Sequence, residues 1–152
     1  MFLKQAFRNS PDSRMPRLEH ANLNVNDADA ITRFITTALP GYRVRGAGTD
    51  GPGGRPWRHV GDDDNYLALT QVGSASSHAP YDQEPGLNHL GFEVDDVDAL
   101  ETRLRKAGFE PNLREDAHPA RRRIYFHDPE GNDWEFVQYL TSDIDQRNDY
   151  SG

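Results

Sequence analysis

The sequence predicts an α+β protein built from tandem βαβββ modules, which form a cupped, barrel-like mixed sheet with helices on its convex face. The first observation is an internal repeat, in which "LEHANLNVNDADA" (18–30) is echoed by "LNHLGFEVDDVDA" (87–99). The second is that each copy reads as a strand, a helix and three further strands. The third is that one module cannot bury its own sheet face, so a second copy must supply the missing partner.

The first module is expected at residues 17–72. In "EHANLNV" (19–25), apolar and polar residues alternate as in a half-buried strand. "NDADAITRFITTAL" (26–39) has apolar residues at helical spacing, with Asn26 or Asp27 as its N-cap. Three more strands are expected, at "YRVRG" (42–46), "RPWRHV" (55–60) and "YLALTQV" (66–72), with a glycine-rich loop after the first and the turn "GDDDN" before the last.

The second module is expected at residues 87–140 and repeats this order. Leu90, Phe92 and Val94 alternate with polar residues or glycine in its first strand, and the helix follows at "DDVDALETRLRKAG" (95–108). Its remaining strands are "FEPNLRE" (109–115), "RRRIYFH" (121–127) and "DWEFVQYL" (133–140). The other segments read as an N-terminal extension (1–16), a linker (73–86) and a polar C-terminal tail (141–152).

Composition narrows the class of partner. The chain has 17 basic and 25 acidic residues, a formal net charge of −8 and no cysteine. An acidic protein is a poor match for nucleic acid or an anionic membrane surface, so the expected partner is a small molecule. The lack of cysteine excludes disulfides and thiolate sites. No signal-peptide core or membrane-spanning run is present, and a cytoplasmic location is expected.

The segment "GAGTDG" (46–51) matches the dinucleotide-binding pattern G-x-G-x-x-G. That mechanism requires a helix directly after the glycines, to hold the pyrophosphate at its N-terminus. Here "PGGRP" follows, so we interpret the segment as a hairpin loop. The aspartates of "GDDDN" (61–65) lack the spacing of a calcium loop and are interpreted as turn formers.

The strand periodicity assigns one face of each sheet to the core. Six large apolar side chains would be exposed in the opposite register: Leu67, Leu69, Ile124, Phe126, Trp134 and Phe136. The other faces should then line a shared concavity. Its expected residues are His20, Asn22, Asn24, Tyr66, Ala68, Thr70, His89, Gly91, Glu93, Arg123, Tyr125, Glu135 and Val137.

Three of these residues are good ligands for a divalent metal: His20, His89 and Glu135. Taken singly, each is more often an ordinary hydrogen-bonded or solvated side chain than a ligand. Their joint placement favours a metal site, because the two histidines occupy equivalent positions of the repeat and all three share one face. Two imidazoles and a carboxylate suit Zn, Fe(II), Mn, Co or Ni, and they leave open positions for substrate.

The repeat and the segment "RRRIYFHDPEGNDWEFVQY" (121–139) resemble the vicinal oxygen chelate superfamily. This superfamily includes glyoxalase I, extradiol dioxygenases, methylmalonyl-CoA epimerase, fosfomycin-resistance thiol transferases and bleomycin-resistance proteins. The resemblance covers roughly Arg17 to Leu140 and implies that Glu135, His20 and His89 bind one divalent metal. It also implies a reaction in which the metal chelates two neighbouring oxygens of the substrate.

One position departs from the pattern that the resemblance implies. Glyoxalase I and the epimerase carry a fourth ligand, a glutamate or glutamine, where our alignment places Ala68. Gln71 is nearby, but its parity puts it on the buried face. The three-ligand set therefore favours an extradiol dioxygenase-type reaction. The alternatives are a glyoxalase-like lyase or isomerase, a thiol transferase, or a non-catalytic small-molecule or antibiotic-binding resistance protein.

The remaining site residues are assigned around the metal. Tyr125 is either a proton donor or a partly buried strand tyrosine, and His118 is either an acid/base group or an exposed loop residue. The predicted substrate-binding residues are Arg123, Asn22, Tyr66 and Thr70. Proteins of this architecture often pair modules across a dimer, so a homodimer is expected and the metal site can lie within one chain or between two.

Overall fold

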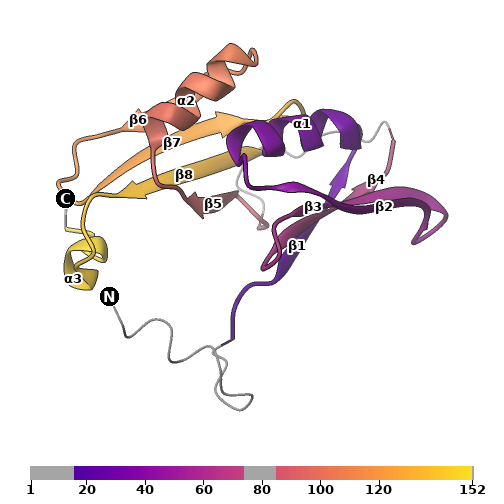
Figure 1. Cartoon of the computed structure of the whole chain (residues 1–152), viewed down its shortest axis with the longest axis horizontal. Helices are drawn as coiled ribbons and strands as arrows, with labels where there is room; N and C mark the ends of the chain where they lie inside the picture. The colour runs from indigo at the N-terminus through magenta and orange to yellow at the C-terminus, as the bar shows by residue number, and fades with distance from the viewer. Residues whose placement is uncertain (1–15, 74–84, 152) are drawn as a thin grey trace.

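The structure is a computed structural model that describes residues 16–73 and 85–151 (Figure 1). Almost all of the expected N-terminal extension (1–16) and linker (73–86) lie outside the described residues. The first module consists of β1 (His20–Val25), α1 (Ala28–Ala38), β2 (Arg43–Gly51), β3 (Arg55–Gly61) and β4 (Tyr66–Gln71). Its sheet has the order β1-β4-β3-β2, with β1 parallel to β4 and the other pairs antiparallel.

The second module repeats this topology. It consists of β5 (His89–Glu93), α2 (Val97–Lys106), β6 (Pro111–Glu115), β7 (Arg121–His127) and β8 (Asp133–Tyr139), in the order β5-β8-β7-β6. A short helix α3 (Ile144–Arg147) lies in the segment expected as a tail. The predicted α+β fold of tandem βαβββ modules is confirmed, although the chain forms two curved sheets that do not close into a barrel. None of the described helices is long and apolar enough to span a membrane.

Both helices begin in the same way. The Asp27 side chain accepts a hydrogen bond from the Ala30 amide, and Asp96 does so from the amides of Asp98 and Ala99, so both aspartates are N-caps. A glutamine at the end of the last strand accepts from the first helical amide of each module. These pairs are Gln71 with Ala28 (3.2 Å) and Gln138 with Val97 (3.2 Å).

The modules share one hydrophobic core. Helices α1 and α2 lie side by side on the same side of the two sheets (Figure 1). Phe34 of α1 is fully buried and packs against Trp134 of β8 and against Phe109, with ring centroids 5.6 and 5.1 Å apart. The six apolar residues used to choose the strand register are all buried, which confirms that register: Leu67, Leu69, Ile124, Phe126, Trp134 and Phe136.

The glycine-rich segment is part of a strand, and our interpretation of it as a loop is wrong. Strand β2 continues through Gly51, and the turn follows at Gly53 and Gly54, whose φ values are +72° and +68°. Gly48 pairs with Trp57 of β3, and a Cβ atom at Gly48 would lie 2.6 Å from the indole Nε1. Glycine is needed here because the indole ring occupies the space of a side chain.

The aspartates that form the β3–β4 and β7–β8 turns differ in how many hydrogen bonds their side chains accept. Asp62 accepts hydrogen bonds from two backbone amides through Oδ1 alone. Asp128 is buried, and its two oxygens accept four hydrogen bonds, from the amides of Glu130 and Asn132, from Asn132 Nδ2 and from Trp134 Nε1. Burial raises the pKa of Asp128, while these donors oppose the shift by favouring the ionised form.

We expect Asp128→Asn to lower the free energy of unfolding by about 2–3 kcal/mol, because one acceptor oxygen becomes an NH2 group facing two buried donors. Asp62→Asn is the matched control, since it keeps Oδ1 as acceptor and should cost less than about 1 kcal/mol. Urea unfolding of both variants at neutral pH measures the difference. Equal losses would show that the buried hydrogen bonds of Asp128 contribute nothing specific.

Candidate active site

The faces of the sheets that are turned away from the helices carry the predicted site residues. Along β1, exposed His20, Asn22 and Asn24 alternate with the more buried Ala21, Leu23 and Val25. The strand register places His20 beside Tyr66 and His89 beside Asp133. We call these two surfaces the open face of the first sheet and the open face of the second sheet.

His89 and Glu135 meet on the open face of the second sheet, where His89 Nε2 lies 3.1 Å from Glu135 Oε2. Their side chains are 33% and 16% exposed. Gly91 is the neighbour of Glu135 in the parallel ladder, and a Cβ there would lie 3.6 Å from Glu135 Oε2, so glycine leaves space beside the carboxylate. Asn88 Oδ1 lies 2.6 Å from His89 Nδ1.

The opposed atoms of His89 and Glu135 suit either a hydrogen bond or a shared cation. With Nε2 3.1 Å from Oε2, a protonated Nε2 would donate to the carboxylate, whereas an unprotonated Nε2 and the carboxylate oxygen would both present a lone pair to the same metal ion. The pair therefore suits two ligands of a divalent metal.

Tyr125 and Arg123 surround the same carboxylate. Tyr125 is 8% exposed and donates a hydrogen bond to Glu135, and its ring meets that of His89 edge-on at 5.9 Å. Burial, followed by the interaction with Glu135, raises the pKa of the Tyr125 phenol well above its usual value, so the hydroxyl stays protonated. Arg123 Nη1 lies 3.9 Å from Glu135 Oε1, and the same guanidinium also pairs with Glu115.

His20 belongs to the open face of the first sheet. Its Nδ1 lies 2.7 Å from Glu19 Oε2, and its ring stacks on Tyr66 at 4.9 Å with an interplanar angle of 13°. A carboxylate on Nδ1 orients an imidazole so that Nε2 is available to a ligand. Thr70 Oγ1 lies 3.4 Å from Asn22 Oδ1 on the same face.

The register supports the position assigned to the missing fourth ligand. Ala68 pairs with Asn22, which lies two residues after His20. In the second module, Glu135 pairs with Gly91, which lies two residues after His89. Ala68 is buried and has no coordinating atom. Gln71 lies on the helix side of the sheet, because its Oε1 accepts from the Ala28 amide.

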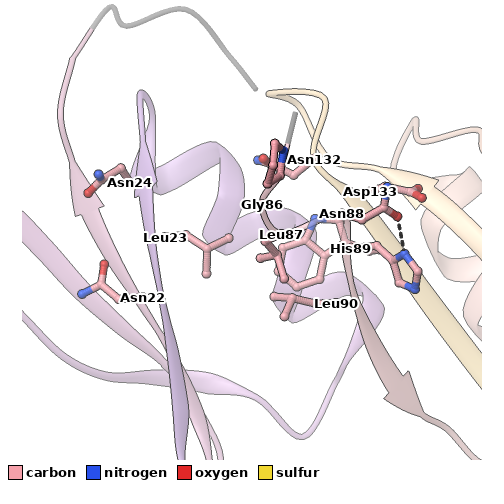
Figure 2. Close-up of a pocket in the computed structure, with 12 residues that line it drawn as sticks. Asn22, Leu23, Asn24, Gly86, Leu87, Asn88, His89, Leu90, Asn132 and Asp133 are labelled. Atoms are coloured by element: carbon pink, nitrogen blue, oxygen red, sulfur yellow. Dashed lines mark hydrogen bonds between the residues drawn. The ribbon is translucent and has the colours of Figure 1, made fainter. Parts of the chain in front are cut away.

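The open faces contact each other only in part within one chain. A cavity of about 380 Å³ is lined by His20 and Tyr66 of the first sheet and by Gly91 and Glu93 of the second, but not by His89 or Glu135. In Figure 2, Asn22 and Asn24 extend from one side of β1, whereas His89 lies beyond β5 on the opposite side. A cavity of about 320 Å³ separates the strands, with Leu23 and Leu90 facing each other across it. No group of three or more His, Cys, Asp or Glu side chains suited to a metal occurs among the described residues. Four residues of the expected concavity thus share a cavity, whereas His20, His89 and Glu135 are not grouped together among the described residues.

His118 lies at the edge of the second sheet and contacts the C-terminal segment. Its Nε2 is 3.2 Å from the Asp149 carbonyl oxygen, and its Nδ1 accepts from the Ala120 amide at 3.1 Å. Arg121 is buried, and it donates a hydrogen bond to the same Asp149 carbonyl oxygen at 2.9 Å. Both ring nitrogens of His118 are thus engaged with the backbone.

Sequence reasoning overlooked three residues on the open face of the first sheet. Trp57 and His59 contact each other at 4.8 Å, His59 contacts Tyr66 at 4.6 Å, and the Arg45 guanidinium lies over the Tyr66 ring. The alternation in "RPWRHV" already places Trp57 and His59 on one face, so the same parity argument that selected Tyr66 was sufficient to find them. Burial, with Arg45 and His20 nearby, lowers the pKa of His59.

Comparison with solved structures gives the same fold. A glyoxylase/bleomycin resistance protein/dioxygenase domain from Frankia sp. EAN1pec has a TM-score of 0.67 and 24% identity, covering 83% of this chain and 99% of that one. The fosfomycin resistance protein FosX from Listeria monocytogenes has a TM-score of 0.67 and 18% identity, covering 88% and 99%. A FosX variant solved with Mn(II) and 1S,2S-dihydroxypropylphosphonic acid has a TM-score of 0.66 and 19% identity, covering 88% and 98%.

No curated protein sequence matches the chain at a significant level. The model of one family does match, over residues 17–136, which include β1 through most of β8. The chain therefore belongs to the Glyoxalase/Bleomycin resistance protein/Dioxygenase superfamily.

Proposed function

We propose that the protein is a metal-dependent enzyme whose divalent ion is held by His89 and Glu135 of one copy and His20 of a second copy. Its substrate is a small oxygen-rich molecule that chelates the metal through two neighbouring oxygens. The observation that carries the proposal is the opposed pair His89 Nε2 and Glu135 Oε2, 3.1 Å apart on an open face. The ion would act as a Lewis acid that stabilises negative charge developing on the chelated oxygens.

The case for a second copy rests on packing. His20 shares a face of β1 with Asn22 and Asn24, whose side chains point away from His89, and no three suitable ligands lie together among the described residues. Strands β1 and β5 are each at an edge of their sheets, where they have no hydrogen-bonded neighbour on one side among the described residues. A two-fold dimer can place the open face of each first sheet over the open face of the partner's second sheet, which gives two equivalent sites.

Each neighbouring side chain has a role in this proposal. Tyr125 holds Glu135 through its hydroxyl hydrogen bond, and its raised pKa keeps the phenol protonated, so that it acts as a hydrogen-bond donor and not as a base. Arg123 attracts an anionic substrate group. Asn22, Thr70 and Tyr66 contribute the opposite wall beside His20. The proposal gives no proton-transfer role to His118, because backbone groups engage both ring nitrogens.

The type of reaction follows from the number of ligands. With Ala68 in place of a fourth ligand, the site favours an extradiol dioxygenase-type reaction over glyoxalase-like lyase or isomerase chemistry. A thiol transferase or another three-ligand reaction is the second candidate, and FosX with Mn(II) and a vicinal dihydroxy compound on the same fold supports a three-ligand reaction other than thiol transfer. A resistance protein that binds its ligand without chemistry is the alternative if no metal binds.

The metal site is tested first by elemental analysis of protein purified without chelator and then incubated with Fe(II), Zn(II) or Mn(II). We expect about one ion per chain in the wild type and a loss of nearly all of it in Glu135→Ala, since two remaining ligands hold a metal poorly. The control is Glu110→Ala, which removes an exposed carboxylate paired with Arg105 and should retain the metal.

The identity of the metal indicates the type of reaction. Iron would favour oxygen chemistry, whereas zinc, nickel or manganese would favour lyase, isomerase or transferase chemistry. A metal-free wild type would overturn the enzyme proposal.

Mixed dimers test whether the site is shared. We expect His20→Ala and Glu135→Ala to lose metal separately, whereas a purified dimer with one chain of each regains about half the wild-type content, because one of its two sites is intact. The control pairs His89→Ala with Glu135→Ala and should regain nothing, since both changes affect the same half of the site. Elemental analysis of doubly tagged dimers measures this. Failure of the first pair to regain metal would contradict a shared site.

The support given to Glu135 by Tyr125 is tested with Tyr125→Phe. Removing the hydroxyl should weaken metal binding by about tenfold, as is typical when a ligand loses its supporting hydrogen bond. Tyr139→Phe is the control, because Tyr139 lies at the far end of β8 and contacts Arg147 through its ring. Competition against a metal-binding dye measures both affinities. Identical affinities for Tyr125→Phe and wild type would remove Tyr125 from the site.

A further inference from the structure

The open face of the first sheet carries a line of aromatic rings, Trp57, His59, Tyr66 and His20, which we call the ring row. Successive ring centroids are 4.8, 4.6 and 4.9 Å apart. The register places Trp57 beside Thr70 and His59 beside Ala68, so these rings share the face that carries His20. All four rings are partly or largely exposed, which is unusual for so much contiguous aromatic surface.

The glycines of β2 hold the first ring in place. A Cβ at Gly48 would lie 2.6 Å from Trp57 Nε1, and one at Gly51 would lie 2.9 Å from Trp57 Cδ1. The indole therefore lies against the backbone of β2, and its Nε1 donates to Asp50 Oδ1 at 3.1 Å. The segment "GAGTDG", which is not a dinucleotide-binding motif, thus lets the Trp57 ring of β3 pack against the backbone of the edge strand β2.

Arg45 supplies a positive charge above the ring row. The register shifts between Val44 and Gly46, and the Arg45 Cζ lies 4.6 Å from the centroid of the Tyr66 ring. Within residues 16–73 and 85–151, Arg45 forms no salt bridge. Asp62 attracts Arg45 electrostatically, but the hydrogen bonds that its side chain accepts come from the amides of its own turn.

We propose that the ring row and Arg45 form a subsite for a planar, conjugated carboxylate, with the ring of the ligand against Trp57 and His59 and its carboxylate on Arg45. Flat rings favour a flat ligand because stacking adds to the burial of apolar area. A guanidinium that forms no salt bridge favours an anion, and its planar donors match a carboxylate. This subsite deepens the proposed function and rests on it only for its position next to the metal, through His20.

The test uses the full chain in EDTA, so that coordination to a metal cannot contribute to binding. The probes are benzoate, cyclohexanecarboxylate, which lacks the aromatic ring, and benzamide, which lacks the charge. Trp57 is partly exposed and Trp134 is buried, so quenching of tryptophan fluorescence reports on the subsite. We expect benzoate to bind at least about fivefold more tightly than either relative. Equal affinities, or no binding of any probe because a second copy covers the ring row, would overturn the proposal.

Variants measured by calorimetry separate the two contributions. Arg45→Gln should abolish the preference for benzoate over benzamide, whereas Lys106→Gln, which removes one charge on α2, should leave it unchanged.

The contribution of the ring is tested at Trp57. Trp57→Leu should abolish the preference for benzoate over cyclohexanecarboxylate, whereas Trp57→Phe should retain it. Gly48→Ala, which displaces the indole without removing it, should weaken benzoate as Trp57→Leu does. An effect of Lys106→Gln equal to that of Arg45→Gln would overturn the proposal. Because no metal is present, these outcomes are independent of whether His20 is a ligand.

Discussion

The packing of Phe34 between the two sheets is the contact on which the rest of the arrangement depends. Helix α1 belongs to the first module, yet its fully buried Phe34 meets Trp134 of the second sheet. Burying large side chains of this kind contributes roughly 1.5–3 kcal/mol each, far more than any exposed contact of the histidines. The apolar faces of both sheets therefore turn toward the shared helices, and the side chains of Asn22 and Asn24 point away from His89. The proposed metal site, which combines His89 with His20, accordingly draws on two chains.

The two copies of the repeat have the same residues at positions that build the fold and different residues on the open faces. Asp27 and Asp96 cap the helices, and Gln71 and Gln138 hold their first amides in the same way. On the open faces, the positions beside the two histidines differ between the copies. The first sheet has Asn22, Tyr66 and Ala68 where the second has Gly91, Asp133 and Glu135. One face thus offers the carboxylate proposed as a metal ligand, while the other offers rings and amides.

The fold could be predicted because its determinants are local or repeat along the chain. Alternation of two residues identified the buried face of each strand, and the burial of Leu69 and Trp134 confirms it. The glycine strand was missed because its reason lies across a hairpin, in the indole of Trp57. The separation of His20 from His89 could not be predicted either, because it depends on how the two modules pack. No periodicity in the sequence encodes that packing. His118 was ambiguous for the same reason, because its partner at Asp149 lies in a remote segment.

The two halves of the proposed site depend differently on assembly. In the proposed site a second copy contributes His20, so metal affinity would be linked to dimerisation and would fall on dilution below the dimer dissociation constant. The ring row and Arg45 lie within a single first module, and the binding of a planar anion there carries no such dependence. Under this proposal, a chain that has lost its partner can still hold such a ligand but has no complete metal site with which to react. Chemistry would then be confined to the assembled protein, where Glu135, Tyr125 and the ring row would face the same substrate.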